Sequence, residues 1–196
     1  MPPFSQAAEN NKNVIGEVLL EAFSSCKLVL EIASGTGQHA VHMGALMPDV
    51  IWQTSDLAEN HDNIIQRLAL EAGENVRRPF ALDVAQDDWQ VGEVDGAFAA
   101  NAVHIMSWQH VEALFAGLEK HLAKGGILAL YGPYKYGGEY TTESNARFDQ
   151  WLKDRDAASG IRDFEAVDGL AQNIGLQLQA DHKMPANNQL LIWKRV

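Results

Sequence analysis

The segment that most constrains this chain runs from Val29 to Ala40 and reads VLEIASGTGQHA. An apolar stretch ends at Glu31, a loop of small residues follows, and a helix-like pattern begins near His39. Small side chains let a ligand approach the backbone closely, and the first turn of a helix offers N–H groups that have no partner within the helix. We therefore expect a nucleotide-like cofactor here. A tight turn that holds no ligand is the alternative, although such a turn would not require two glycines, an alanine and an acid together.

One interpretation of the loop makes the chain an NAD-dependent oxidoreductase. Read from Gly35 to Ala40 as G-x-G-x-x-A, the loop matches the dinucleotide fingerprint. Asp56 follows roughly 20 residues later, where such folds place an acid on a ribose. In this register, however, the strand would continue to Ser34. Glu31 would then be an unpaired carboxylate within a buried parallel strand, which is costly.

A shifted register favours a different cofactor. Read from Glu31 to Gly37 as E-x-A-x-G-x-G, the loop resembles the first motif of class I S-adenosylmethionine-dependent methyltransferases. That motif closes the first strand with an acid, and Ala33 here replaces its first glycine. The resemblance implies that Glu31 faces the cationic methionine end of S-adenosyl-L-methionine. It also implies cofactor contacts from the loop residues Ala33, Ser34, Gly35, Thr36 and Gly37.

Composition and charge narrow the class of protein. The 196 residues are 46% hydrophobic, which is ample for a core, and we expect a single domain over residues 1–196. The net charge of -11 disfavours nucleic acid as a partner and favours a small-molecule substrate. No apolar run could span a bilayer, no signal peptide is evident, and a lone Cys26 agrees with a reducing compartment. We therefore expect a cytoplasmic protein with no membrane partner, and the oligomeric state stays open.

Apolar runs alternate with helical patterns along the chain. The expected strands are 27–32, 50–55, 76–82, 94–100 and 127–131, and a closing hairpin pairs 176–182 with 189–194. The expected helices are 9–23, 39–47, 58–72, 107–122, 144–156 and 163–174, the first of them within an N-terminal helical segment, 1–26. This order predicts an α/β fold with a mostly parallel sheet and helices on both faces. It resembles the Rossmann-like class I methyltransferase fold, which has seven strands and a C-terminal antiparallel hairpin.

Acidic residues end the second and third expected strands, where open α/β sheets bind ligands. The family resemblance implies that Asp56, followed by Leu57, accepts the ribose hydroxyls. It implies in the same way that Asp83 accepts the adenine amino group and that Val84 packs on the ring. Either aspartate could instead cap the helix that follows it.

The segment after the fourth expected strand contains the candidate catalytic residue. Asn101, Ala102 and Val103 are placed to meet the methionine portion of the cofactor. His104 is a candidate general base, because histidine can accept a proton near neutral pH; it could also line the pocket without any proton transfer. The Asp/Asn-Pro-Pro-aromatic motif of many base-modifying amino methyltransferases is absent here, in agreement with the acidic charge.

Three segments are expected on the substrate side. A loop rich in tyrosine and glycine begins the segment 132–162, which we interpret as a mobile lid and a helix. The turn at 184–188 should lie at the same end of the sheet. Asn10, Asn11 and Lys12 could close the cofactor site, although a solvated start of a helix explains these residues equally well. The candidate substrate residues are Tyr134, Tyr136, Tyr140, Asn187 and Asn188. The tyrosines could instead pack on the surface of the domain.

Four segments, 8–12, 144–149, 160–163 and 184–188, look like an uncharacterised methyltransferase-like family known only as a domain of unknown function. The sequence thus predicts a methyltransferase that uses S-adenosyl-L-methionine, methylates a small molecule and releases S-adenosyl-L-homocysteine. The alternatives are the NAD-dependent oxidoreductase and a non-catalytic S-adenosylmethionine-binding protein. No metal site is expected, because nothing completes a site around His39 and His42.

Overall fold

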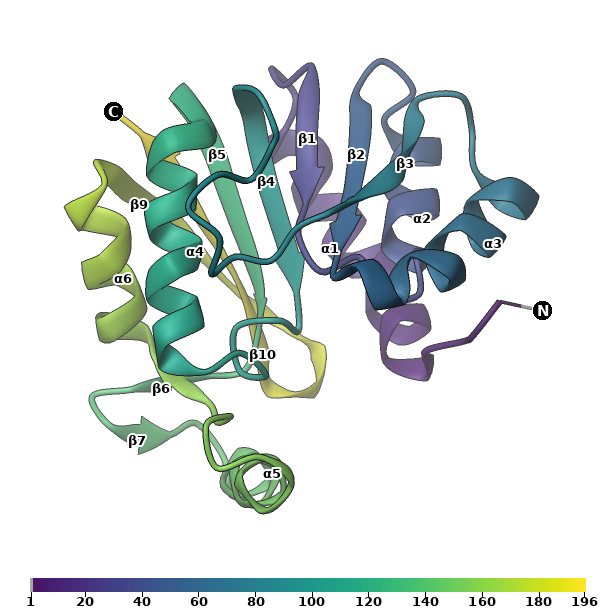
Figure 1. Ribbon diagram of the computed structural model, residues 1–196. Helices are drawn as coiled ribbons and strands as arrows, with labels where there is room; N and C mark the ends of the chain where they lie inside the picture. The colour runs from purple at the N-terminus through teal and green to yellow at the C-terminus, as the bar shows by residue number, and fades with distance from the viewer. Residues whose placement is uncertain (1) are drawn as a thin grey trace.

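The computed structural model describes residues 2–196, which form a seven-stranded sheet covered by helices on both faces (Figure 1). The strand order is β3-β2-β1-β4-β5-β10-β9, and β10 runs antiparallel to both of its neighbours. The strands are β1 (Leu28–Glu31), β2 (Ile51–Asp56), β3 (Val76–Ala81), β4 (Val94–Ala100), β5 (Leu122–Gly132), β9 (Leu176–Met184) and β10 (Asn188–Arg195). The predicted α/β fold with a C-terminal antiparallel hairpin is confirmed.

The helices divide between the two faces of the sheet. Three cover one face: α1 (Gln6–Ala22), α2 (Gln38–Leu46) and α3 (His61–Glu71). The other face is covered by α4 (Trp108–His121) and α6 (Phe164–Asn173). None of the helices in residues 2–196 combines the length and the apolar character needed to cross a membrane.

A smaller unit lies at the carboxyl ends of the parallel strands (Figure 1). It contains α5 (Glu143–Arg155) and a second sheet with the strand order β7-β6-β8. These strands are β6 (Tyr134–Tyr136), β7 (Glu139–Tyr140) and β8 (Arg162–Asp163). Two short 3₁₀ turns, η1 (Ala58–Asn60) and η2 (Pro185–Asn187), complete the elements.

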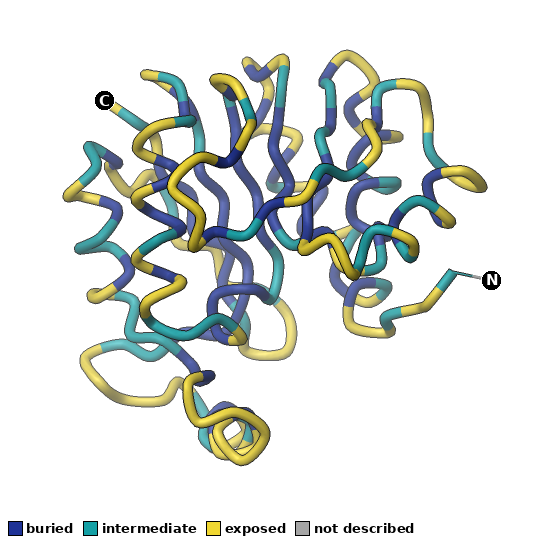
Figure 2. The backbone as a smooth tube through the Cα atoms, viewed as in Figure 1, coloured by how far each residue is buried: buried dark blue, intermediate teal, exposed yellow. Residues whose placement is uncertain are grey.

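The core has two layers because successive residues of a strand face opposite sides of the sheet. In β1, Val29 packs among α1, α2 and α3, whereas Leu30 packs among α4 and α6. The same alternation runs through Phe98 and Ala99 of β4. Figure 2 accordingly shows buried backbone concentrated in the central strands. Near-continuous apolar strands of this kind are typical of a sheet covered on both faces.

Most element boundaries lie within a few residues of the sequence-based expectation, and two elements differ in form. The helix expected over 58–72 is divided into η1 and α3. The fifth strand begins at Leu122 rather than Ile127, because Leu122 pairs with Val94 of β4 before a shift in register, after which Ile127 pairs with Gly96. Gly125 takes a left-handed φ of 82° within this irregular stretch. Glycine adopts this conformation without strain. Gly125 therefore interrupts the helical pattern of the sequence, yet the strand continues through it as an irregular stretch.

The helix α4 packs closely on Trp89, and this contact can be tested at Gly117. A Cβ atom on Gly117 would lie 1.9 Å from the buried Trp89 ring. We expect Gly117→Ala to lower the free energy of unfolding by roughly 1–3 kcal/mol in urea denaturation. Gly169→Ala in α6 is the matched control, because a Cβ there meets open space. That variant should be up to about 1 kcal/mol more stable, and equal effects at the two sites would contradict this packing.

Candidate functional site

Two cavities open at the carboxyl ends of the parallel strands. The first has a volume of about 540 Å³ and lies over the ends of β1, β2 and β4. The second has a volume of about 920 Å³ and lies between α1, α5 and η2. Both are lined by Ser5, Asn101 and Ile105, so they adjoin one another. Volumes of several hundred Å³ are typical of small-molecule sites.

The predicted loop forms one wall of the first cavity. β1 ends at Glu31, as expected, and the loop then takes left-handed φ angles at Ala33 (57°), Gly35 (57°) and Gly37 (73°). This alternation turns the chain sharply into α2. Glycine adopts such angles freely, whereas Ala33 does so at a cost of roughly 1–2 kcal/mol.

Left-handed backbone at residues other than glycine gathers around the two cavities. Ala33 and Asn101 line the first cavity, and Asn101, Ala186 and Asn187 line the second. Gln90 is the remaining such residue among those described. Strained backbone persists only where its surroundings hold it in place, and it clusters at ligand sites. The two cavities are therefore the leading candidates for a functional site.

Asp56 connects the loop to the end of β2. Its Oδ2 accepts the Gly35 N–H at 2.7 Å, and its Oδ1 accepts the Leu57 N–H and the Asn60 amide, each at 2.8 Å. The side chain lines the first cavity but is only 6% exposed. Asp56 does not cap a helix, because Leu57 is the N-cap of η1. A carboxylate offers about four acceptor positions, so one remains for a ligand.

Asp83 and Val84 lie beside an apolar part of the first cavity. Asp83 Oδ1 accepts the Ala85 N–H at 3.0 Å in a short turn, and no helix follows it. Val84 is buried and lines the cavity together with Leu82. An apolar surface beside a half-free carboxylate can accommodate a flat ring that carries an amino group.

Most of the predicted cofactor residues come together at this cavity, but three do not line it. Ala33, Ser34, Gly35, Thr36, Asp56, Leu57, Asp83, Val84, Asn101 and Ala102 line the first cavity. Gly37 and Val103 lie outside its lining, and Val103 packs into the core. Glu31 also lies behind the loop, where its carboxylate accepts the Trp52 indole N–H at 2.9 Å. Burial raises the pKa of Glu31 to about 7, against the smaller opposing effect of this hydrogen bond.

An N-terminal strap closes over the loop; we use this name for residues 3–9. The amide of Ser5 donates to Gln38 Oε1 at 2.6 Å, and Gln38 Nε2 donates to Glu9 at 3.2 Å. Arg67 donates to the carbonyl oxygens of Thr36 and Pro3, each at 2.7 Å, and so joins the loop to the strap. The strap brings Ser5 and Ala8 into the lining of the first cavity. Sequence reasoning anticipated closure from this end of the chain but did not single out Gln38 or Arg67.

His104 lines the second cavity and is 5% exposed. Its ring meets the edge of Phe148, with ring centroids 5.5 Å apart and planes at 71°. Burial, helped by the charge of Arg162, lowers the pKa of His104 to about 4. The imidazole is therefore uncharged near neutral pH and keeps a nitrogen lone pair that can accept a hydrogen bond.

The three tyrosines of the predicted lid line neither cavity. Tyr134 is buried in the core, and Tyr136 stacks on Phe164 and donates to Asp181 at 2.7 Å. Tyr140 donates to Asp149 at 2.6 Å. They belong to β6 and β7, whose pairing fixes them in the small sheet. The alternative in which the tyrosines pack on the domain thus describes their placement.

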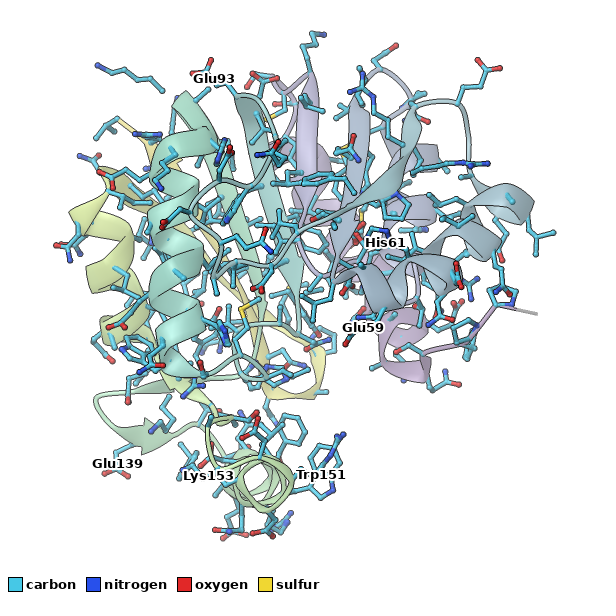
Figure 3. The ribbon with its side chains drawn as sticks, in the orientation of Figure 1. Glu59, His61, Glu93, Glu139, Trp151 and Lys153 are labelled. Carbon is cyan, nitrogen blue, oxygen red and sulfur yellow. The ribbon has the colours of Figure 1, made fainter. Side chains whose placement is uncertain are left out.

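The other substrate candidates, Asn187 and Asn188, do line the second cavity. Sequence reasoning missed its aromatic wall, formed by Phe148 and Trp151 of α5. Tyr131, which ends the fifth expected strand, also lines this cavity. Figure 3 shows Trp151 and Lys153 projecting from opposite sides of α5. The signals for these residues were the helical pattern over 144–156 and the family resemblance of segment 144–149, which contains Phe148. His39 was also missed as a lining residue of the first cavity, where its ring bonds Asn11 Oδ1 at 2.7 Å.

Comparison with known families shows the family of this chain. A sequence profile described as "Protein of unknown function (DUF938)" matches residues 2–195. The chain belongs to the DUF938 family. The uncharacterised family expected from the sequence is thereby confirmed as a family of unknown function.

Solved structures share the fold of this DUF938 protein at low sequence identity. An O-methyltransferase family protein from Burkholderia thailandensis has a TM-score of 0.86 and 17% identity, over 97% of this chain and 56% of that one. An O-methyltransferase family 2 protein from Planctomyces limnophilus, in complex with apigenin, has a TM-score of 0.82 and 15% identity, over 97% and 58%. Human N-acetylserotonin methyltransferase, in complex with SAM, has a TM-score of 0.76 and 17% identity, over 93% and 52%.

The DUF938 chain spans a little over half the length of these structures. At such identities the similarity establishes the fold, which is the class I methyltransferase fold predicted from the order of elements.

The buried Glu31 makes stability depend on pH. Its pKa of about 7 lies above its ordinary 4.5, so the folded protein keeps a proton that the unfolded chain releases between these values. The contribution of Glu31 to stability should therefore fall as pH rises through this window, and Glu31→Gln should escape this loss. Relative to wild type, we expect the unfolding free energy of Glu31→Gln to rise by roughly 1–3 kcal/mol between about pH 5 and pH 8.

Urea denaturation at the two pH values measures this change. Glu17→Gln, on the exposed side of α1, is the control and should show no such trend. If the unfolding free energies of Glu31→Gln and wild type differ by the same amount at both pH values, burial does not raise the pKa of Glu31.

Proposed function

We propose that this DUF938 protein is an S-adenosyl-L-methionine-dependent methyltransferase with a small-molecule acceptor. The observation that carries the proposal is the charge of the first cavity. Its lining, as far as residues 2–196 form it, contains the carboxylates of Asp56 and Asp83 and no lysine or arginine. S-adenosyl-L-methionine has a sulfonium and an ammonium group against one carboxylate, so it is a net cation. NAD brings a diphosphate with two negative charges, which two aspartates would repel.

The strap supplies a second argument against a dinucleotide. Dinucleotides place their pyrophosphate at the N-terminus of the helix after the glycine loop. Here Gln38, the first residue of α2, is bound to the Glu9 carboxylate and to the Ser5 backbone. A pyrophosphate at that position would meet a negative charge and displace these bonds.

The residues of the first cavity fit the parts of an adenosyl cofactor. The free acceptor position of Asp56 suits a ribose hydroxyl, and the free oxygen of Asp83 suits the adenine amino group beside Val84. Glu31 lies behind the loop with a raised pKa, and a nearby ammonium group would favour its ionised form. Asn101, in the lining of both cavities, lies where the cofactor and the acceptor would meet.

The cofactor, when bound, supplies an electrophilic methyl group on sulfur. The protein would contribute orientation and the exclusion of water, which are the main requirements of an in-line displacement. His104, uncharged and buried in the second cavity, would accept a hydrogen bond from the attacking hydroxyl or amine. Its lowered pKa makes it a weak base. A weak base suffices if the proton leaves after the new bond forms, because the methylated oxygen is then strongly acidic.

Ligand-induced stabilisation tests the choice of cofactor. At a ligand concentration a hundredfold above Kd, S-adenosyl-L-homocysteine should stabilise the protein by about 2.7 kcal/mol, whereas NAD should have no effect. Asp56→Asn replaces the acceptor Oδ2 by a donor facing Gly35 and should weaken the adenosyl ligand roughly 10- to 100-fold.

Asp49→Asn is the matched control, because this exposed aspartate lies at the opposite end of β2. It should leave the affinity for S-adenosyl-L-homocysteine unchanged when the affinities of both variants are measured by isothermal titration calorimetry. Stabilisation by NAD, with none by S-adenosyl-L-methionine or S-adenosyl-L-homocysteine, would overturn the proposal. Tight adenosyl binding without methyl transfer to any acceptor would instead favour the non-catalytic binding protein.

The state of His104 can be measured without knowing the acceptor. An NMR titration of the histidine rings should show midpoints near 4 for His104 and for the buried His39, and the signal lost in His104→Gln identifies His104. The variant should keep its affinity for S-adenosyl-L-homocysteine, since His104 does not line the first cavity. A midpoint near the ordinary 6.5 would contradict the uncharged state at mildly acid pH.

A further inference from the structure

The second cavity has an aromatic wall. The rings of Phe148 and Trp151 stack with centroids 5.7 Å apart and planes at 18°, and Phe148 leads on to His104. All three line the cavity, and Trp151 is 50% exposed. A half-exposed indole on the wall of a cavity offers a flat apolar surface, on which another ring can stack.

Apart from these rings, the lining combines apolar side chains, such as Ile105 and Leu152, with uncharged polar groups. The polar groups are amides and hydroxyls, namely Ser5, Asn10, Asn11, Asn101, Tyr131, Ser144, Asn145, Ser159, Asn187 and Asn188. Asn11, Asn145 and Ser159 are almost completely buried. Such groups bind hydroxyl and carbonyl oxygens by hydrogen bonds, and they do not neutralise an ionised ligand.

Charged residues in this lining lie at its edge. They are Arg155 and Asp156, both exposed at the end of α5, and they carry opposite charges. The Arg155 guanidinium lies 4.6 Å from the centre of the Trp151 ring. A carboxylate carried into the interior would therefore lose its hydration without gaining a buried cation, which is unfavourable.

Tyr131 and His104 have complementary hydrogen-bonding roles in this cavity. The Tyr131 oxygen accepts the Asn188 amide at 3.0 Å, so its own hydrogen is directed toward another acceptor. His104, being uncharged, provides an acceptor. Tyr131 and His104 thus provide a donor and an acceptor, respectively, for oxygen groups of a ligand beside the aromatic wall.

We propose that the second cavity binds an uncharged, planar aromatic compound with at least two oxygen substituents, one of them the methyl acceptor. The ring stacks on Trp151 in place of the exposed Arg155 guanidinium, one hydroxyl group donates to His104, and a second oxygen accepts from Tyr131. This inference rests on the proposed methyltransferase function, because it names the acceptor of that reaction. The binding of such a compound can nevertheless be measured without any cofactor.

The test uses three probes on the whole ¹⁵N-labelled chain, with and without S-adenosyl-L-homocysteine. These are 2,3-dihydroxynaphthalene, 3-hydroxy-2-naphthoate, which has a carboxylate in place of one hydroxyl, and inositol, which is rich in oxygen but not flat. The Trp151 indole signal, identified among the five tryptophans by its loss in Trp151→Phe, reports contact at the wall. We expect the diol to shift this signal and to bind roughly tenfold more tightly than either other probe.

Variants locate the site and control for structural effects. Trp151→Ala should weaken the diol roughly tenfold, and Trp151→Phe should change its affinity by less than about threefold. Tyr131→Phe should weaken it roughly fivefold, whereas Tyr136→Phe, outside both cavities, should have no effect.

Three outcomes would overturn the proposed class of ligand. The naphthoate or inositol binds more tightly than the diol, the diol does not bind at all, or the diol binds and leaves the Trp151 signal unchanged. Failure of S-adenosyl-L-homocysteine to bind, while the diol still shifts the Trp151 signal, would contradict the proposed methyltransferase function and leave the ligand class supported.

Discussion

The hydrogen bond from the Gly35 N–H to Asp56 is the contact on which the first cavity depends. At 2.7 Å it joins the loop after β1 to the carboxyl end of β2. The same side chain holds the Leu57 and Asn60 nitrogens, and the Asp56 carbonyl is bonded to the His61 ring at 3.1 Å, near the start of α3 (Figure 3). A single carboxylate thus sets the positions of two loops that line the cavity. Hydrogen bonds to a charged acceptor are stronger than neutral ones, which suits this role.

The loop after β1 is supported on both sides. Buried side chains pack behind it, and the N-terminal strap closes over its front. Behind the loop, the buried Glu31 and Trp52 fill the space between the sheet and its helices. In front, the strap is held by Gln38 and by the buried Arg67. The strained angle at Ala33 persists because both sides of the loop are fixed. The charge of the cavity then selects among ligands, since its aspartates face no lysine or arginine within the described lining.

The fold could be predicted from the sequence because its signals are local. Alternating apolar strands and helical patterns gave the order of the elements, and the Glu31–Gly37 motif gave the register of the loop. Asp56, Asp83 and Asn101 were identifiable because each ends or follows a strand, and parallel strands bring those ends to one edge. Residues chosen in this way gather at the first cavity.

The second cavity was harder to predict because its walls come from distant parts of the chain. Asn11 belongs to α1, Trp151 to α5 and Asn187 to η2, and only the tertiary fold brings them together. The tyrosines at 134, 136 and 140 were expected in a mobile lid. Pairing of β6 with β7 and β8, which neither hydropathy nor motif indicates, places them in a small sheet and outside the lining of both cavities. Burial of Glu31 behind the loop also depends on Trp52, a partner on another strand.

A crystal structure of the chain grown with S-adenosyl-L-homocysteine tests the central claim most directly. We expect the ligand in the first cavity, with a ribose hydroxyl within hydrogen-bond distance of Asp56 and the adenine beside Asp83 and Val84. An empty first cavity at a saturating concentration of the ligand, or the ligand bound elsewhere, would contradict the account.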